Sequence, residues 1–212
     1  MAALFTGAVG ALEVILDEPD RDPVGLAIVA HPQPLLGGNA THKIPQVLAK
    51  AIRDAGWRVA RPNFRGVGGS VGAHDFGAGE AEDLLLLHGQ LLQEHPGLRV
   101  ALVGFSFGAY VQARVAKVLV ATGTPPSHLC LAGMPAGDVE GSRHYDTPPD
   151  LPNALVIHGE MDERVRLQSV LDWARPHSQA ITVVPGADHF FTGRLPVLRN
   201  IVLADLARGD FS

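Results

Sequence analysis

The sequence has little of several features that would indicate where the protein works or what it binds. Cys130 is the only cysteine, which excludes an internal disulfide and agrees with a reducing compartment, so we expect a cytoplasmic protein. The net charge of -5 leaves no excess of basic residues to neutralise phosphates, so nucleic acid is not an expected partner. The apolar runs are far shorter than the roughly 20 residues of a membrane-spanning helix, so no membrane partner is expected.

Signals for export, metals and nucleotides are missing as well. The apolar N-terminal segment has no Lys or Arg before Arg21 and carries Glu13, which argues against a signal peptide. The His-Glu-x-x-His pattern and paired metal-ligand spacings do not occur, and the glycine-rich residues 66–72 match neither G-x-G-x-x-G nor a Walker pattern. We therefore expect no metal and no other cofactor.

The sequence does contain a regular alternation of β-prone and helical segments. Its 212 residues, 46% of them hydrophobic, fit a single domain over residues 1–212. Short β-prone runs at 4–6 and 12–16 predict an antiparallel hairpin. The strands expected after it are 24–30, 57–60, one that begins at 99, 128–132, 154–158 and 180–184, and the helices are 46–55, 80–95, one that ends near 120, 167–174 and 195–207. This order predicts an α/β fold, with a mostly parallel sheet and helices on both faces.

A candidate nucleophile lies where the predicted strand from residue 99 ends. Ser106 stands in the sequence Gly-Phe-Ser-Phe-Gly, after an apolar run and before a segment of helical periodicity. A strand, a sharp turn and a helix in this order hold a serine in a strained conformation with its hydroxyl exposed, which is the nucleophile elbow. Ser70 also matches G-x-S-x-G, but it has neither a strand before it nor a helix after it, so we interpret it as a loop residue.

Two further strand ends supply an acid and a base. Asp162 follows the strand predicted at 154–158, and His189 follows the strand predicted at 180–184. Parallel strands present their carboxyl ends at one edge of the sheet, so both residues are expected near Ser106. A serine hydroxyl needs an imidazole to take its proton, and the imidazole needs a carboxylate to fix its tautomer. Glu160 and Asp188 are the alternative acids, for which we expect roles in bracing their loops.

The other histidines are weaker candidates for the base. His88 and His95 lie on a predicted helix face, and His31 and His158 end strands ahead of the loops expected to carry function. Four further competitors are expected at surface or loop positions, namely His42, His128, His144 and His177.

An oxyanion needs two hydrogen-bond donors. The first candidate is the backbone N–H of Phe107, at the start of the helix that follows Ser106. The second lies in the loop after the strand 24–30, where Pro32 and Pro34 have no N–H to donate. The backbone N–H of Gln33, between these prolines, is therefore the candidate, with Leu35 behind it; a proline-stiffened turn without this role is the alternative.

These motifs resemble those of small α/β-hydrolases. The resemblance extends over most of the chain and includes a His-Pro-x-Pro-x-x-Gly-Gly loop at 31–38, an Asn-Phe-Arg-Gly-x-Gly-x-Ser-x-Gly segment at 63–72 and a Gly-x-Gly-Glu-x-x-Asp helix start at 77–83. Gln33 departs from the pattern, since many relatives carry histidine there. The resemblance implies the α/β-hydrolase fold and the hydrolysis of esters or related compounds, without naming a substrate.

Two shared features bear on the shape of the site. For Arg65, Glu80 and Asp83 we favour an ion pair that braces residues 63–79 over direct contact with substrate. Only about 20 residues, 133–152, lie between two predicted strands at the position where related enzymes insert a helical cap. They are too few for a cap domain, so we expect a flap over an open site and a preference for short acyl chains.

Together these observations predict a serine hydrolase with Ser106, Asp162 and His189 as its catalytic residues. It would cleave carboxylic esters or thioesters of small acyl groups through an acyl-enzyme on Ser106. A peptidase or a cofactor-free perhydrolase could use the same residues. The alternative from another class is a non-catalytic binding module that keeps the fold. The sequence leaves the oligomeric state open.

Overall fold

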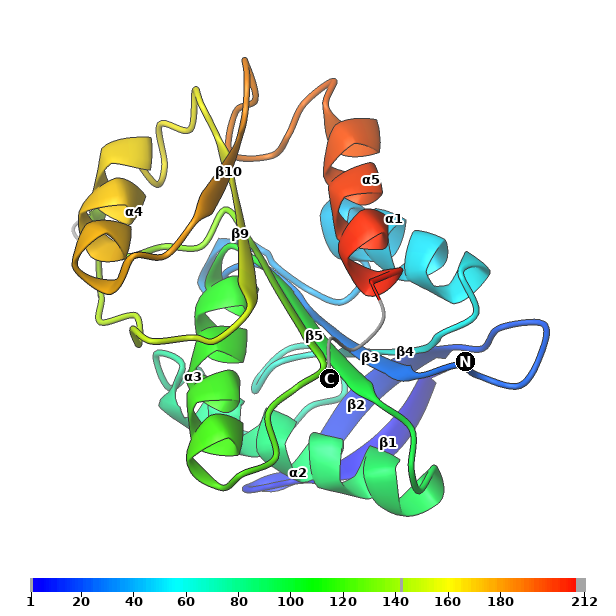
Figure 1. Ribbon diagram of the computed structural model, residues 1–212. Coiled ribbons are helices and arrows are strands. Elements are labelled where there is room, and N and C mark those ends of the chain that lie inside the picture. Colours follow the sequence, from blue (N-terminus) through cyan, green and yellow to red (C-terminus); the bar gives the residue numbers. More distant parts are fainter. Residues whose placement is uncertain (1, 142, 209–212) are drawn as a thin grey trace.

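The computed structural model describes residues 2–141 and 143–208, and its core is a sheet of eight strands (Figure 1). The strands lie in the order β1-β2-β4-β3-β5-β6-β9-β10. Their bounds are β1 Ala2–Gly7, β2 Gly10–Asp17, β3 Leu26–Ala30, β4 Arg58–Pro62, β5 Val100–Phe105, β6 His128–Ala132, β9 Ala154–Gly159 and β10 Ile181–Val184. β2 pairs antiparallel with β1 and β4, and the other neighbours run parallel. The predicted fold class, a mostly parallel sheet with an N-terminal hairpin, is confirmed.

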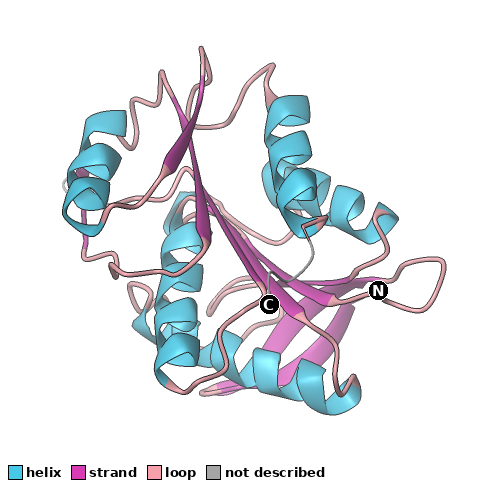
Figure 2. Cartoon of the chain, in the orientation of Figure 1, coloured by secondary structure: helices cyan, strands magenta, loops and turns pink. Residues whose placement is uncertain are grey.

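Helices cover both faces of this sheet, as Figure 2 shows. Their bounds are α1 Lys43–Asp54, α2 Ala78–Glu94, α3 Phe107–Ala121, α4 Leu167–Ala174 and α5 Leu195–Leu206, with short 3₁₀ helices at Pro34–Leu36 and Arg175–His177. Leucines 84, 87 and 91 of α2 pack with α3 into one hydrophobic core, and Ile44 and Leu48 of α1 pack with α5 into the other. The strands between them are buried on both sides, which explains their continuous apolar runs.

The start of α1 differs from the prediction. We expected the helix to begin at Gln46, and it begins at Lys43, with His42 as its N-cap residue. Pro45 therefore lies in the first turn. The N–H groups of a first turn have no partner within the helix, so proline there removes no helical hydrogen bond.

The segment between β6 and β9 contains a small hairpin instead of a cap domain. Strands β7 (Gly137–Val139) and β8 (Arg143–Tyr145) pair antiparallel outside the main sheet. We predicted a flap here but not its strands. Three residues a strand, with glycine and charged side chains between them, give too short a pattern to detect.

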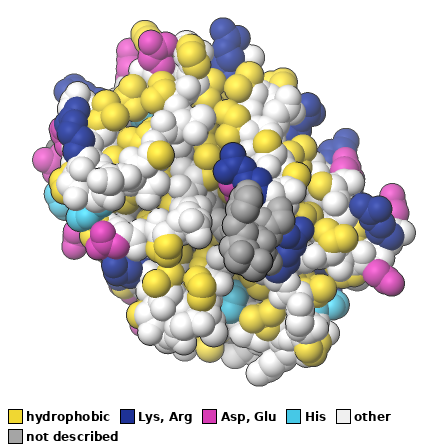
Figure 3. Space-filling view, in the orientation of Figure 1, with side chains coloured by type: hydrophobic (Ala, Val, Ile, Leu, Met, Phe, Trp, Pro, Cys, Tyr) yellow, Lys and Arg dark blue, Asp and Glu magenta, His cyan; other side chains and the backbone are white. Residues whose placement is uncertain are grey.

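The described part of the surface in Figure 3 has no segregation of side chains by type. On the face in Figure 3, hydrophobic side chains lie scattered among charged and polar ones. Within the described parts of the chain, every helix is too short or too polar to cross a bilayer.

Candidate active site

Ser106 occupies a sharp turn between β5 and α3. Its backbone has φ 55° and ψ -122°, a conformation that L-residues rarely adopt. The strand and helix on either side approach so closely that only glycine fits next to the turn. A Cβ on Gly104 would lie 2.5 Å from the Cα of Ala109, and one on Gly108 would lie 2.5 Å from the carbonyl oxygen of Ala30. The backbone alone thus fixes the position of Ser106.

The structure brings Ser106, His189 and Asp162 together in one line of contacts. Ser106 Oγ lies 3.0 Å from His189 Nε2, and His189 Nδ1 lies 2.7 Å from Asp162 Oδ2. Asp162 follows β9 and His189 follows β10, so both side chains come from the edge of the sheet at which β5 ends. A carboxylate only accepts hydrogen bonds, so Nδ1 of the imidazole donates, and Nε2 is left to accept a proton from the serine.

The carboxylate of Asp162 is held by its own loop. Its Oδ1 accepts the backbone N–H groups of Arg164 at 3.0 Å and Val165 at 2.8 Å, and its side chain is fully buried. The two alternative acids are engaged elsewhere. Glu160 accepts the N–H of Gly186 at 2.8 Å, and Asp188 accepts that of Thr192 at 2.8 Å. Asp162 is therefore the carboxylate in contact with His189.

The two residues expected to supply oxyanion donors are Phe107, which follows Ser106 directly, and Gln33, which lines the same pocket. Phe107 is the first residue of α3, where a helix leaves its N–H groups without internal partners. Gln33 borders the same pocket as Ser106, and its carbonyl oxygen accepts the N–H groups of Leu36 and Gly38, which closes the loop. A Cβ on Gly38 would lie 2.1 Å from the carbonyl oxygen of Pro32, so this turn requires glycine.

The fold is similar to that of known structures. An α/β serine hydrolase without a lid from Xanthomonas campestris is 34% identical, with a TM-score of 0.86 over 100% of this chain and 95% of that chain. This chain belongs to the α/β serine hydrolases. A serine hydrolase homologue from Coxiella burnetii is 33% identical, with a TM-score of 0.84 over 98% of this chain and 97% of that chain.

This hydrolase also has a curated sequence relative in a third organism. An uncharacterized protein of Rickettsia prowazekii is 32% identical over an alignment of 199 residues, which covers 88% of this chain and 80% of that protein. No protein-family model matches the chain.

His31, a buried histidine to which the sequence analysis gave no role, holds the loop that contains Gln33 in this hydrolase. His31 Nδ1 lies 2.7 Å from the carbonyl oxygen of Pro32, and its Nε2 accepts the N–H of Phe64 at 3.0 Å. One partner can only accept and the other can only donate, so a single neutral tautomer fits. Burial lowers the pKa of His31 to about 4, which keeps the ring neutral. Its place at the end of a strand was the signal in the sequence.

Two other histidines lie closer to the site than predicted. His158 is fully buried, with Nε2 2.8 Å from the carbonyl oxygen of Val165 and 3.5 Å from Asp162 Oδ2. His42, expected at a surface or loop position, is half-buried, borders the pocket and stacks on Phe105. Burial lowers the pKa of both rings, and for His42 the charge of His189 lowers it further.

His128 also differs from the prediction, at a distance from the site. We expected a surface or loop position, but its side chain is buried and lies 3.2 Å from Asp205 Oδ2. A histidine that starts a strand and pairs with a carboxylate of a distant helix cannot be distinguished from a surface histidine by local sequence.

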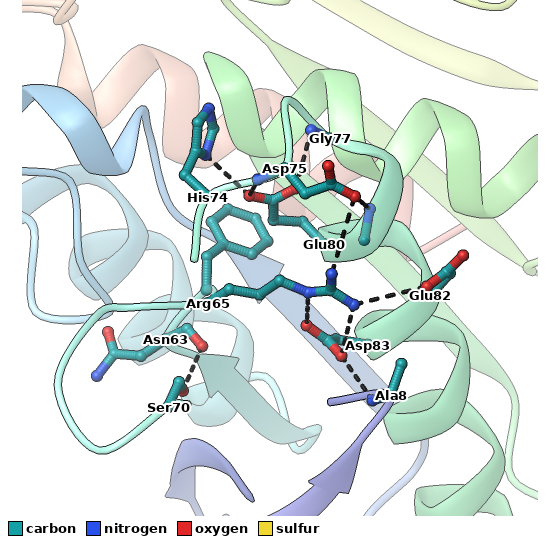
Figure 4. A network of polar contacts seen from close by, with 12 residues as sticks. Ala8, Asn63, Arg65, Ser70, His74, Asp75, Gly77, Glu80, Glu82 and Asp83 are labelled. Carbon is teal, nitrogen blue, oxygen red and sulfur yellow. Dashed lines mark hydrogen bonds and ion pairs between the residues drawn. The ribbon is translucent and has the colours of Figure 1, made fainter. Parts of the chain in front are cut away.

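Arg65 and the two acids of the shared segments form a brace, which Figure 4 shows. Arg65 Nε donates to Asp83 Oδ2 at 2.6 Å, and Asp83 Oδ1 also accepts the N–H of Ala8 at 2.7 Å. The bond to Asp83 raises the pKa of Arg65. Glu80 accepts the N–H groups of Asp75 at 2.9 Å and Gly77 at 2.8 Å. These contacts join residues 63–79 to α2.

Ser70, the second match to G-x-S-x-G, belongs to the same loop. Its Oγ donates to the carbonyl oxygen of Asn63 at 2.7 Å and accepts the N–H of Glu13 at 2.9 Å. The side chain is buried and both bonds go to backbone groups. These contacts agree with its interpretation as a structural loop serine.

The pocket above Ser106 is small, with a volume of about 140 Å³. Gln33, His42, Tyr145 and Phe190 contribute to its wall. Gln33 Nε2 lies 3.2 Å from the Tyr145 hydroxyl, which joins the loop after β3 to the flap. Across residues 2–141 and 143–208, no group of three or more His, Cys, Asp or Glu side chains is placed to hold a metal ion.

Proposed function

We propose that the protein hydrolyses carboxylic esters or thioesters of small acyl groups through an acyl-enzyme on Ser106. The observation that carries this proposal is the continuous line of contacts from Ser106 Oγ through His189 to Asp162, at 3.0 Å and 2.7 Å. Membership of the α/β serine hydrolases supports it. A serine alone at the elbow would be a poor nucleophile at neutral pH, and the neighbouring imidazole removes that limit.

In the first half-reaction, Ser106 Oγ attacks the carbonyl carbon of the ester while His189 Nε2 takes the hydroxyl proton. The tetrahedral intermediate collapses, and the proton passes from His189 to the departing alcohol or thiol. In the second half-reaction, His189 takes a proton from water, the resulting hydroxide attacks the acyl-enzyme, and the proton returns to Ser106 as the acid leaves. Asp162 keeps the imidazole in the required tautomer and stabilises its charged form.

The negative charge of the tetrahedral intermediate would be stabilised by the backbone N–H groups of Phe107 and Gln33. The N-terminus of α3 adds the positive end of its dipole at the same point. His31 supports this arrangement because it holds the carbonyl oxygen of Pro32, directly before Gln33.

The size of the pocket supports small acyl groups. Its volume of about 140 Å³ is well below the roughly 300–1,000 Å³ of pockets for drug-sized ligands. In the described residues of the flap at 133–152, the only regular structure is the short hairpin β7–β8, so a long acyl chain would find little apolar cover.

A fluorophosphonate probe tests the proposal directly. It should label the wild-type protein once, and peptide mapping should locate the label on Ser106. Ser106→Ala should abolish labelling, whereas Ser70→Ala should retain it because Ser70 contacts backbone groups away from the pocket. Labelling that persists in Ser106→Ala would overturn the assignment. A wild-type protein inert toward the probe and toward a panel of esters would favour a non-catalytic role.

A further inference from the structure

The pocket above Ser106 differs in charge from the rest of the molecule. The chain has 22 acidic and 17 basic residues, for a net charge of -5. Yet the charged side chains among the described residues that line this pocket are two arginines, Arg143 and Arg164, and none is Asp or Glu. The two histidines of the wall, His42 and His189, add no negative charge. An acidic protein thus presents a cationic pocket at its nucleophile.

Arg143 reaches the pocket from the flap. It begins β8, and its Nε and Nη2 donate to the carbonyl oxygen of Glu140 at 3.2 Å and 2.9 Å. These bonds hold the guanidinium group in place without neutralising it. Within residues 2–141 and 143–208, no carboxylate forms an ion pair with Arg143. Its positive charge is therefore available to a ligand.

Arg164 borders the same pocket and lies in the loop that holds Asp162, where its carbonyl oxygen accepts the N–H of Glu140 at 3.1 Å. Its guanidinium carbon lies 5.1 Å from the centre of the Phe190 ring, and its Nη1 lies 3.6 Å from Glu140 Oε2. Both partners are surface groups: the side chains of Arg164 and Glu140 are 46% and 58% exposed. A pair this long and this exposed is weak, so an anionic ligand can compete with Glu140 for the arginine.

We propose that Arg143 and Arg164 bind an anionic group of the substrate, a carboxylate or a phosphate, so that the preferred substrates are esters or thioesters bearing such a group. The inference rests on the proposed function of Ser106. Guanidinium groups suit this task because their planar donors match the oxygens of carboxylates and phosphates. A local cationic site also attracts anions toward a protein whose net charge repels them. The two arginines then select among esters that the serine could otherwise cleave equally.

Two matched pairs of esters test the inference and distinguish the side of the ester that carries the charge. The first pair, 3-acetoxybenzoate and 3-acetoxybenzamide, places the carboxylate or the neutral amide on the leaving group. The second pair, monomethyl glutarate and the methyl ester of glutaramic acid, places it on the acyl group. Each pair differs in charge and little in size. For at least one pair, kcat/KM should be about tenfold or more higher for the anionic member at low salt, and the ratio should fall as salt is added.

Variants assign the preference to the arginines. Arg143→Gln and Arg164→Gln should each lower the ratio of anionic to neutral kcat/KM by about tenfold. Using a ratio within one variant removes any general loss of folding or activity. Arg166→Gln is the matched control, since Arg166 is exposed, lies two residues from Arg164 and does not border the pocket. Its ratio should stay that of the wild type. Glu140→Gln should raise the ratio, because it frees Arg164.

Equal kcat/KM within both pairs would overturn the inference, and so would a preference that neither arginine variant lowers. Failure to cleave both anionic esters would overturn it as well. The proposed function is judged separately by labelling of Ser106 with the fluorophosphonate probe. A labelled protein without charge preference keeps the hydrolase assignment and loses only the anionic substrate.

Discussion

The imidazole of His158 donates to the carbonyl oxygen of Val165 across 2.8 Å. The N–H of the same Val165 donates to Asp162 Oδ1, also at 2.8 Å. One peptide loop therefore connects a fully buried histidine to the carboxylate that contacts His189. His158 does not border the pocket, so we expect it to act on the site through this loop, as a positioning residue.

Replacing His158 should reduce turnover through Asp162. His158→Leu removes the donor to Val165 and should lower kcat by about tenfold or more, because the carboxylate loses its fixed position. His158→Gln retains an N–H donor and should recover part of that loss. The measurement is kcat for both variants beside their melting temperatures. Equal kcat values for the two variants at similar stability would show that the hydrogen bond to Val165 has no part in positioning.

The ion pair between Arg65 and Asp83 should stabilise the fold. Arg65→Met leaves the Asp83 carboxylate buried with its charge uncompensated, and should lower the free energy of unfolding by roughly 3–5 kcal/mol. Arg53→Met is the control, since the Arg53–Asp54 pair is exposed and should contribute less than about 1 kcal/mol. Urea unfolding of both variants and the wild type gives the comparison. A loss below about 1 kcal/mol for Arg65→Met would contradict the bracing role.

Stability should depend on pH through His31. Burial lowers its folded-state pKa to about 4, whereas an unfolded chain titrates near its ordinary value of 6.5. Between these two values the unfolded chain binds more protons, so the free energy of unfolding rises with pH across this window and falls as the pH drops toward 4. The contribution of this one group is at most about 1.4 kcal/mol per pH unit.

His31→Gln removes the titration of His31 and leaves those of His42 and His158, whose lowered pKa values act in the same direction. The difference between variant and wild type therefore reports His31 alone. The variant is expected to be less stable at neutral pH, but its free energy of unfolding should depend less steeply on pH. Urea unfolding at several pH values inside this window, from about 4.5 to about 6.5, measures both slopes. Parallel slopes for variant and wild type would show that His31 is not the group that titrates.

Much of the fold was predictable because local pattern decides it. The strand His128–Ala132 and the helix Leu167–Ala174 have the bounds that periodicity and turn residues indicated. The alternation of strands and helices then determined which ends share one edge of the sheet, and hence which acid and which base to choose for Ser106.

Contacts between distant segments were not predictable from local sequence. His42 and His158 look like other loop and strand-end histidines, and only the packing of α1 and β9 brings them to the site. The same holds for Arg143, at the start of β8, and Arg164, in the loop after β9, which border one pocket. Strands of three residues such as β7 and β8 are too short for their periodicity to be recognised.

The length of the acyl group should limit catalysis. A pocket of about 140 Å³ buries few methylene groups, each worth about 0.8 kcal/mol, so kcat/KM should stop rising beyond short chains. The measurement compares p-nitrophenyl acetate, butyrate, octanoate and palmitate. A steady increase up to palmitate, or activation at a lipid interface, would reveal an apolar cover that the short flap does not provide.

The central claim is that Ser106 carries the acyl group during turnover, with His189 moving its proton and Asp162 orienting the imidazole. Ser106→Ala and His189→Ala should each reduce kcat by on the order of 10³ or more, and Asp162→Asn by somewhat less. The most direct test is mass spectrometry of the wild-type protein quenched in acid during hydrolysis of p-nitrophenyl acetate. The account predicts one acetyl group per chain, mapped to Ser106 and absent from Ser106→Ala. An acetyl group on another residue, or one that persists in Ser106→Ala, would contradict it.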